Sequence, residues 1–421
     1  MKKRLLRLLA ALAFLVYMAG FFYITQLLTS KQPSSVPAHV ETSQQDAALF
    51  TALFSASVIH VLPNGMPLNS SHIDLNASHW RSLLHSALPA AERIGLWSDR
   101  GEEVLWTRLR GDASAGGVAS VAGAEPTVLW AVADELPFVW PETPIGDVRT
   151  VECADGSVHR LQTLSDRPRV LISRGLLSDV ESAAIRRIAT PRLAVSSTQP
   201  SLLSLARGLA SRVPARRSWN AWLPLPDGDE TAGPEIEGLS QPNDGAVLRA
   251  VWLRVASLVR LRPSTSEDMQ VVRYTEGERF AYHHDNPLGD KSNVASSRVL
   301  TALLYLNEGY EGGAVNFPLA GLRTPIVSGS ELSDMFGTCQ TERGLTVQPR
   351  AGDLLIFYNH LPNTRRDDLW PIHGSCDVKS GVKWAANLFF ELKRMAPKRL
   401  SGDRPQWSLG RPSVHDSRHD S

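Results

Sequence analysis

Two histidines and an aspartate stand together in one short stretch of the sequence, Phe-Ala-Tyr-His-His-Asp-Asn-Pro at residues 280–287. On a β-strand alternate side chains share a face, so His283 and Asp285 would point one way and His284 the other. One imidazole and one carboxylate in that relation can supply two adjacent ligands of a metal ion. We therefore interpret His283 and Asp285 as candidate metal ligands.

A third ligand has to come from elsewhere in the chain, and two histidines are candidates. His360 lies in the segment NHLPN, and His373 lies in WPIHGSC between two strand-like runs. Two histidines and one carboxylate leave coordination positions open, as in the facial triad of non-haem ferrous oxygenases. Zinc accepts the same ligands, so the ligand set alone leaves the metal undecided.

Lys383 helps to decide between these metals. It lies ten residues after His373, in the mainly apolar run GVKWAAN. If it faces inward, its ammonium needs an anionic partner, and a bound dicarboxylate would supply one. No serine or cysteine stands in a nucleophile-elbow pattern nearby, so the sequence does not indicate a hydrolase. An iron site with a dicarboxylate co-substrate is therefore favoured.

A β framework is expected to position these residues. After residue 268 the apolar pattern takes a period of two, in the short runs MQVVRY, RVLTALLYLN, AVNFP, GLTVQP, GDLLIFYN and VKWAANLFFEL. Many short strands in close succession, separated by turn residues, predict a sandwich, barrel or jelly roll.

Two helical patterns precede these strands. In LLSDVESAAIRRIATPRL, Ser178 or Asp179 is placed to cap a helix. The run AVLRAVWLRVASLVRL (246–261) spaces its apolar residues at three and four. Between them, residues 199–243 are rich in Pro, Gly, Asp and Arg and predict surface loops with one ordered stretch at 218–223.

The N-terminus predicts a membrane anchor. Four basic residues within positions 1–7 precede an uncharged apolar run, 8–28. At about 1.5 Å per residue this run crosses the roughly 30 Å core of a bilayer. A cleaved signal peptide would have a shorter apolar region followed by a small-residue cleavage site, so we expect the segment to be retained. The positive charges favour a cytoplasmic N-terminus and a luminal remainder.

Other features of the chain bear on compartment and partners. Asn69 and Asn76 begin sequons, which predict luminal glycosylation, although both can be ordinary polar turns. The three cysteines are too few for a disulfide scaffold, but one pair could bridge in an oxidising lumen. A formal net charge of +1 gives no indication of nucleic-acid binding.

Four ordered blocks of sequence lie between about residues 167 and 393: PRVLISRGLLSDVESAAIRRIATPRL, VVRYTEGERFAYHHDN, RVLTALLYLNEGYEGGAVNFP, and GLTVQPRAGDLLIFYN followed by HGSCDVKSGVKW. Through these blocks the chain resembles the prolyl 4-hydroxylases. These are iron(II)- and 2-oxoglutarate-dependent dioxygenases of the collagen-modifying and plant type. The resemblance implies a mainly β catalytic domain with flanking helices, a double-stranded β-helix (jelly roll), behind the N-terminal transmembrane helix.

The resemblance also implies roles for individual residues. His283, Asp285 and His373 would hold Fe(2+), and Lys383 would pair with the distal carboxylate of the co-substrate 2-oxoglutarate. Tyr274 would hydrogen-bond the same carboxylate. L-ascorbate is implied as a further cofactor that restores oxidised iron.

Substrate contacts and a disulfide follow from the same resemblance. Four residues are implied to contact a peptide: Arg298, Glu267, Arg217 and Trp219. Cys339 and Cys376 match a cysteine pair of the plant-type members. In many members the Gly-Gly pair is followed by Glu-Thr, whereas Gly312-Gly313 is followed here by Ala314-Val315. This difference lies near the expected position of the substrate, so it bears on which substrate is used and does not change the predicted metal ligands.

The expected organisation is a single-pass type II protein of the endoplasmic reticulum or Golgi membrane, with its catalytic domain in the lumen. Its segments would be 1–7 cytoplasmic, 8–28 transmembrane signal anchor, 29–46 stem linker, 47–166 N-terminal luminal region of unknown role, 167–395 dioxygenase domain and 396–421 disordered tail.

The expected reaction converts proline in a peptide or protein to 4-hydroxyproline with O2 and 2-oxoglutarate, and releases succinate and CO2. Two alternatives stay open. An oxygenase of the same fold could act on another side chain, such as lysine, or on a small molecule. A protein of this fold could also be a non-catalytic binding or scaffold protein.

Overall fold

The computed structural model of the chain describes residues 59–63, 65, 73–75, 93–97, 103–108, 116–118, 128–133, 136–196, 216–225, 244–286, 298–322, 339, 341–362 and 364–392. The predicted transmembrane segment 8–28, the stem 29–46, the sequons at Asn69 and Asn76 and the tail 396–421 lie outside these residues. Among the described helices, none has the length and apolar character needed to cross a bilayer.

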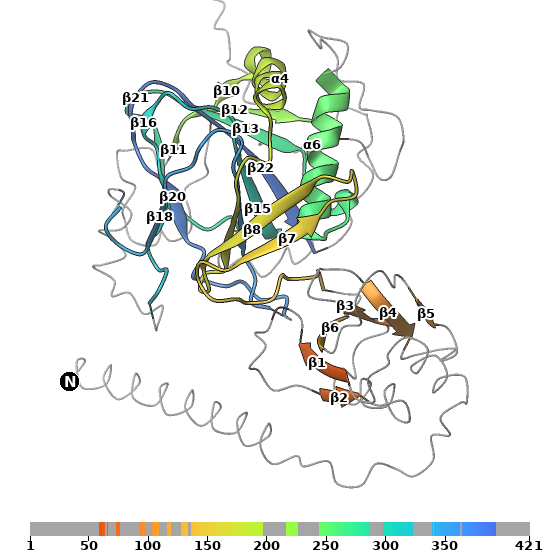
Figure 1. Cartoon of the computed structure of the whole chain (residues 1–421). Coiled ribbons are helices and arrows are strands. Elements are labelled where there is room, and N and C mark those ends of the chain that lie inside the picture. The colour runs from red at the N-terminus through yellow and green to blue at the C-terminus, as the bar shows by residue number, and fades with distance from the viewer. Residues whose placement is uncertain are drawn as a thin grey trace, which may run out of the picture.

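Beyond residue 147 the strands form two large sheets (Figure 1). Their bounds are β7 (Val148–Glu152), β8 (Val158–Ser165), β9 (Val170–Ser173), β10 (Ala194–Val195), β11 (Arg216–Arg217), β12 (Trp219–Leu223), β13 (Met269–Tyr274), β14 (Arg279–His283), β15 (Arg298–Tyr305), β17 (Val315–Phe317), β18 (Leu345–Val347), β19 (Leu354–Tyr358), β20 (His373–Ser375) and β22 (Lys383–Glu391). The larger sheet has the order β10-β12-β13-β22-β15-β19-β9-β8-β7, and the smaller has the order β11-β14-β20-β17-β18. A short pair, β16 (Glu311–Gly312) and β21 (Val378–Ser380), forms a separate two-stranded sheet.

Between β13 and β22 the chain passes repeatedly from one large sheet to the other, with β17 and β18 as consecutive strands of the smaller sheet. The larger sheet contains the run β13-β22-β15-β19, and the smaller contains β14-β20-β17-β18. Every pairing within these two runs is antiparallel. This winding is that of a double-stranded β-helix, so the predicted jelly roll is confirmed.

The period of two explains how a strand of the larger sheet serves two cores. Along β15, Leu300, Ala302 and Leu304 pack into the core on the outer side. Leu303 and Tyr305 pack into the core between the sheets. A strand buried on both faces reads as a nearly continuous apolar run, as RVLTALLY does.

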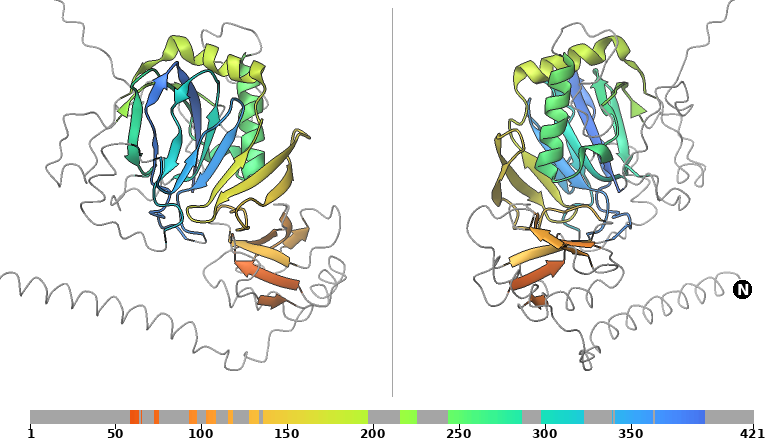
Figure 2. Two further views of the ribbon diagram at one scale, coloured as in Figure 1. Left: turned by 60° about the vertical axis from the view of Figure 1, so that its left-hand side comes forward. Right: turned by 90° about the vertical axis from the view of Figure 1, so that its right-hand side faces the viewer.

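Two helices cover the outer face of the larger sheet (Figure 2). They are α4 (Asp179–Ala189) and α6 (Asp244–Val259), and both were predicted. A capping box starts α4: Ser178 Oγ accepts a hydrogen bond from the Glu181 backbone N–H, and the Glu181 carboxylate accepts one from the Ser178 N–H. Short 3₁₀ turns, η1 (Thr190–Arg192) and η2 (Pro263–Thr265), follow the two helices.

The β7–β8 hairpin joins the larger sheet through β9, although it precedes residue 167, the predicted start of the dioxygenase domain. Val151 and Leu161 of the hairpin pack into the outer core. Since most other side chains of β7 are exposed or half-buried, the hairpin shows little apolar signal in the sequence. The jelly-roll sheet therefore extends into the region that the sequence leaves without a role.

Further towards the N-terminus a separate six-stranded sheet is formed in the order β2-β1-β6-β3-β4-β5. Its strands are β1 (Ile59–Pro63), β2 (Ile73–Leu75), β3 (Arg93–Trp97), β4 (Glu103–Arg108), β5 (Gly116–Val118) and β6 (Val128–Ala133). Trp97 stacks on Phe138 with ring centroids 4.9 Å apart, and Phe138 belongs to the outer core of the jelly roll.

Candidate metal centre and active site

His283, Asp285 and His373 converge between the two sheets. In the antiparallel pair β14–β20, His283 lies directly opposite His373, and Asp285 follows the end of β14. The ligand atoms of all three lie within 4.8 Å of one another. His283 Nε2 is 3.5 Å from Asp285 Oδ1, and His373 Nε2 is 4.0 Å from Asp285 Oδ2. Ligands about 2 Å from a common ion and at right angles lie about 3 Å apart, so small side-chain movements would close this set on one ion.

Hydrogen bonds select the nitrogen that each imidazole presents. His283 Nδ1 is 2.9 Å from the Ala281 carbonyl, and His373 Nδ1 is 2.9 Å from the Pro371 carbonyl. Because a carbonyl only accepts, each Nδ1 carries the proton and donates it. The Nε2 lone pairs therefore face Asp285 and are available to a metal, the arrangement usual for metal-bound histidines.

The protonation states also suit a cation. Burial lowers the pKa of His373 to about 4, which keeps this imidazole neutral near pH 7. Burial by itself raises the pKa of Asp285, but His373, His283 and Arg298 together outweigh it, and the pKa lies well below the ordinary value. An anionic carboxylate beside a neutral imidazole is the state that binds a divalent ion.

The other histidines of the two motifs do not join this set. His284 Nε2 is 2.8 Å from the Asp368 carbonyl, and His360 Nε2 is 3.5 Å from Asp367 Oδ1. Among the described residues, the group His283, Asp285 and His373 is the one cluster with metal-binding geometry. The tertiary structure thus favours His373 over His360 as the third ligand.

Lys383 lies next to this centre, and its side chain is 1% exposed. Its Nζ donates hydrogen bonds to the Gly313 carbonyl at 2.6 Å and to Ser375 Oγ at 2.9 Å. In the part of the chain that the structure describes, no carboxylate pairs with this ammonium. Burial lowers the pKa of Lys383 to about 7. A buried ammonium without a counter-ion is costly and fits a site for an anionic ligand.

The Gly312–Gly313 pair makes room for the lysine. Gly313 has φ +63°, and a Cβ there would lie 3.0 Å from Lys383 Cδ. A side chain at this position would therefore be strained and would crowd the lysine stem. Glycine at 313 is required by the backbone conformation and by the position of Lys383 together.

The separation between the metal ligands and the ammonium suits a small dicarboxylate. Ser375, which contacts Lys383, is two residues beyond His373 on β20, so their Cα atoms are about 7 Å apart. Tyr274 lies opposite Lys383 in the β13–β22 pair, and its ring centroid is 5.3 Å from Nζ. Burial raises the pKa of Tyr274, so the phenol stays protonated and can donate to a carboxylate.

Tyr305 is a further residue of this pocket that the sequence reasoning missed. It is fully buried, and its ring centroid is 5.8 Å from Lys383 Nζ. Its hydroxyl has no hydrogen-bond partner among the described residues. A buried hydroxyl without a hydrogen-bond partner, next to an ammonium without a carboxylate partner, indicates a binding site for a ligand that accepts hydrogen bonds. The alternation along RVLTALLYLN was the available signal, because it places Tyr305 on the inner face.

Two of the implied substrate contacts lie together at the metal centre. Arg298 Nη2 donates to Glu267 Oε2 at 2.8 Å, and Arg298 Nη1 donates to the Asp285 carbonyl at 3.3 Å. The guanidinium also lies 3.6 Å from the centroid of the Phe389 ring. Arg298 and Glu267 thus form an ion pair that borders Asp285.

The structure does not bring Trp219 to the pocket. Trp219 pairs in register with Arg273, whose neighbour Tyr274 faces the pocket, so Trp219 lies on the opposite face of the sheet. The Arg273 guanidinium lies 5.3 Å from the Trp219 ring centroid.

Arg216, and not Arg217, faces the metal centre from β11. Arg217 is exposed and lies opposite Arg279. The Arg216 guanidinium lies 4.8 Å from the centroid of the Phe280 ring, and this ring stacks on His283 at 3.6 Å. Because both residues of the pair are arginines, the sequence does not indicate which of the two side chains points inward.

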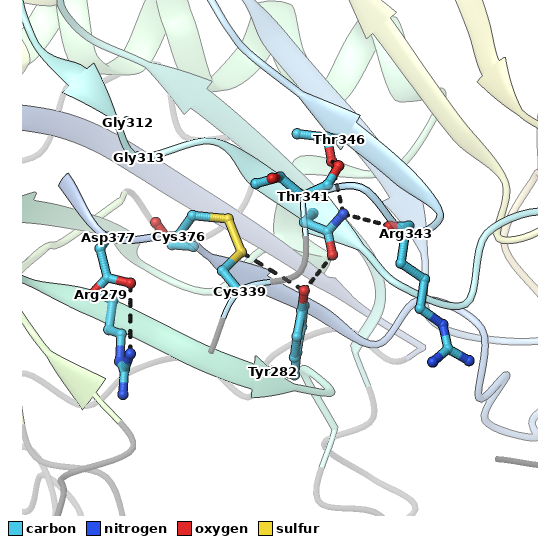
Figure 3. The surroundings of a disulfide bond; sticks show 12 residues. Arg279, Tyr282, Gly312, Gly313, Cys339, Thr341, Arg343, Thr346, Cys376 and Asp377 are labelled. Atoms are coloured by element: carbon cyan, nitrogen blue, oxygen red, sulfur yellow. Dashed lines mark hydrogen bonds and ion pairs between the residues drawn. A yellow bond between two sulfur atoms is a disulfide. The ribbon is translucent and has the colours of Figure 1, made fainter. Parts of the chain in front are cut away.

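Cys339 and Cys376 form a disulfide (Figure 3). Cys376 comes directly after β20, the strand of His373. The Tyr282 hydroxyl, next to His283 in the chain, lies 3.8 Å from Cys339 Sγ. The bridge therefore ties the chain at Cys339 to both ligand-bearing strands. Cys153 is a buried thiol whose pKa is raised by burial, which makes it unreactive.

Known proteins resemble the same part of the chain. Residues 269–391 match the family model of the 2OG-Fe(II) oxygenase superfamily. The chain is 29% identical over 236 residues to "Prolyl 4-hydroxylase 1" of Arabidopsis thaliana, covering 55% of this chain and 72% of that protein. It is 31% identical over 206 residues to "Transmembrane prolyl 4-hydroxylase" of Mus musculus, covering 39% of this chain and 41% of that protein.

Among solved structures, the chain is similar to the viral collagen prolyl hydroxylase vCPH of Paramecium bursaria Chlorella virus-1. The identity is 21%, the TM-score is 0.33, and the match covers 52% of this chain and 94% of that one. A similarity this distant is not evidence for the fold, and the fold assignment is based on the strand order described above.

The residues present fit the cofactors of that family: two imidazoles and a carboxylate for Fe(2+), and a buried ammonium for a dicarboxylate. When bound, iron with 2-oxoglutarate supplies oxygen activation coupled to decarboxylation, and ascorbate keeps the iron reduced. The chain is therefore a dioxygenase of the prolyl hydroxylase type, dependent on Fe(2+) and 2-oxoglutarate, with its 2OG-Fe(II) oxygenase superfamily domain at residues 269–391.

Proposed function

We propose that this enzyme hydroxylates proline residues of a peptide or protein substrate to 4-hydroxyproline. The observation that carries the proposal is the combination of the three ligands with Lys383, a buried ammonium that has no carboxylate partner among the described residues. The relatives named as prolyl 4-hydroxylases support the choice of substrate class.

Each group of residues has a separate task in this proposal. His283, Asp285 and His373 would hold the ferrous ion. Lys383 and Tyr274 would hold and orient the distal carboxylate of 2-oxoglutarate. The two sheets would surround the bound co-substrate, since Lys383, Tyr274 and Tyr305 are buried between them. The Arg298–Glu267 pair borders Asp285 and would position the substrate backbone.

The direct test is hydroxylation of peptides by the full chain purified in detergent. The enzyme is incubated with Fe(II), 2-oxoglutarate, ascorbate and a series of proline-rich peptides, and the products are located by fragmentation mass spectrometry. We expect a gain of one oxygen atom on proline, and amino-acid analysis should identify the 4-hydroxy isomer. His283→Ala should abolish the reaction, whereas His284→Ala is the matched control, because His284 is not one of the three ligands.

The main alternative keeps the oxygenase chemistry and changes the target to another side chain or a small molecule. The same assay separates the two. Oxygen on a non-proline residue, or 2-oxoglutarate turnover that no proline peptide stimulates, would contradict the proposed substrate and leave the dioxygenase assignment intact.

We further propose that the protein is a single-pass type II membrane protein with its catalytic domain in the lumen of the endoplasmic reticulum or Golgi. The support is the uncharged run 8–28 behind the basic positions of 1–7. A protease-protection experiment on sealed microsomes tests it: a C-terminal tag should be protected until detergent is added. An endoglycosidase shift lost in a variant with Asn69→Gln and Asn76→Gln would establish use of the sequons. Digestion of the tag in intact vesicles would refute the topology.

A further inference from the structure

A buried chain of two hydrogen bonds ends on the carboxylate of Asp285. Thr301 Oγ1 donates to Asp285 Oδ2 at 2.6 Å. Asn359 Nδ2 in turn donates to Thr301 Oγ1 at 3.0 Å. Thr301 is 1% exposed and Asn359 is 0% exposed, so water does not compete for either bond.

The order of donors gives the chain a direction. A threonine hydroxyl has one proton, and its oxygen can accept as well as donate. Since the Asn359 amide donates to the Thr301 oxygen, the hydroxyl proton is directed to Asp285. The carboxylate therefore keeps one oxygen engaged with the protein, while Oδ1 faces His283 Nε2 at 3.5 Å.

The backbone holds both donors in place. Thr301 lies in the middle of β15, paired with Phe357 of β19 and with Phe389 of β22. The Asn359 backbone N–H donates to the Val299 carbonyl at 2.9 Å, and its carbonyl accepts from the Asp368 N–H at 2.8 Å. These pairings and hydrogen bonds fix the backbone positions from which the two side chains extend.

The composition of β15 shows that the threonine is not there for packing alone. Its sequence RVLTALLY is apolar between Arg298 and Tyr305 except at Thr301. A buried hydroxyl in such a strand needs a partner, and the partner here is a candidate metal ligand. The Asn359 Oδ1 atom is buried and has no hydrogen-bond partner among the described residues, so the contact that this side chain makes is its donation to Thr301.

We propose that Thr301 and Asn359 are positioning residues for the metal centre. They hold the Asp285 carboxylate so that one oxygen is reserved for the ion, and they thereby set the affinity for the metal. The inference rests on the proposed use of His283, Asp285 and His373 as ligands. It assigns a role to two side chains that bind neither the ion nor the substrate.

The test measures metal affinity directly and does not depend on turnover. The full chain in detergent is titrated with Mn(II) by calorimetry without 2-oxoglutarate, and thermal unfolding of the metal-free protein is recorded in parallel. Thr301→Val keeps the shape and removes the hydroxyl, and we expect it to weaken Mn(II) binding about 10- to 100-fold, the effect usual for residues that support a ligand. Thr301→Ser restores the hydroxyl and should bring the affinity back to within about threefold of the original.

Two further variants complete the design. Asn359→Leu removes the amide donor and should also weaken Mn(II) binding, by less than Thr301→Val, because the hydroxyl is freed but still present. Thr163→Val is the matched control: Thr163 is a buried threonine of the same sheet whose hydroxyl contacts Thr143 at 2.7 Å, away from the metal ligands. It should leave the affinity unchanged.

A folded Thr301→Val protein that binds Mn(II) as tightly as the original would overturn the proposal. The same holds if Thr163→Val weakens binding equally, or if Thr301→Ser does not restore it. If Thr301→Val does not fold, Asn359→Leu provides the test instead. Unchanged Mn(II) affinity in Asn359→Leu would then refute the proposed role of the two hydrogen bonds. A different result is expected if His283, Asp285 and His373 are not the metal ligands. In that case His283→Ala would also bind Mn(II) as tightly as the original protein.

Discussion

Removing the charge of Lys383 is the sharpest perturbation of the co-substrate pocket. Lys383→Met keeps most of the buried volume and deletes an ammonium that donates to Gly313 and Ser375. A hydrogen bond to a charged group contributes about 1.5–3 kcal/mol. At about 1.4 kcal/mol per factor of ten, the variant should bind 2-oxoglutarate about 10- to 150-fold more weakly.

The assay is calorimetric titration of 2-oxoglutarate into the Mn(II)-loaded protein, together with the KM for 2-oxoglutarate in uncoupled turnover. Without 2-oxoglutarate the variant should unfold at a higher temperature than the original, because a desolvated, unpaired charge has been replaced by an apolar side chain. Lys379→Met is the matched control, since Lys379 is exposed on β21, just before this segment.

The pH dependence gives an independent check. In the ligand-free protein burial lowers the pKa of Lys383 to about 7, far below its ordinary value of 10.5. The ammonium form binds the dicarboxylate, so affinity should be constant below about pH 7 and fall up to tenfold per pH unit above it. Between the two pKa values the unfolded chain binds the extra proton, so the stability of the ligand-free protein rises with pH across that window. Equal 2-oxoglutarate affinity in Lys383→Met, or a pH dependence that survives the substitution, would refute this reasoning.

Three other predictions concern the ligands, the pocket and the disulfide. Asp285→Ala should abolish both Mn(II) binding and turnover, because it removes the single carboxylate ligand; retained turnover would exclude Asp285 from the centre. Tyr305→Phe should raise the KM for 2-oxoglutarate about 2- to 10-fold, as expected for one neutral hydrogen bond, and an unchanged KM would mean that the Tyr305 hydroxyl does not contact the co-substrate. Replacing both Cys339 and Cys376 by serine opens a loop with a sequence separation of 37 residues and should cost about 2–4 kcal/mol in the free energy of unfolding, measured by denaturant titration. Identical unfolding curves would show that the bridge contributes nothing to stability.

The local features of this protein are determined by the sequence alone. Ser178 and Glu181 stand at the spacing of a capping box, and the helix begins there. The period-two runs after residue 268 became the strands of the jelly roll. The close spacing of His283 and Asp285 keeps their ligand atoms near each other, although β14 ends at His283 and Asp285 lies just beyond the strand. Such features depend on neighbours within a few positions, which the sequence displays directly.

Only the tertiary structure decided which distant residues meet. The residues alone left His360 and His373 open, and the register of β14 against β20 placed His373 opposite His283. The inward direction of Arg216 and the supporting bonds from Thr301 and Asn359 likewise depend on strand pairings between segments far apart in the chain. The physical reason is that a strand pattern specifies two faces but names neither its partner nor which face lies inward, since both follow from how the sheets pack.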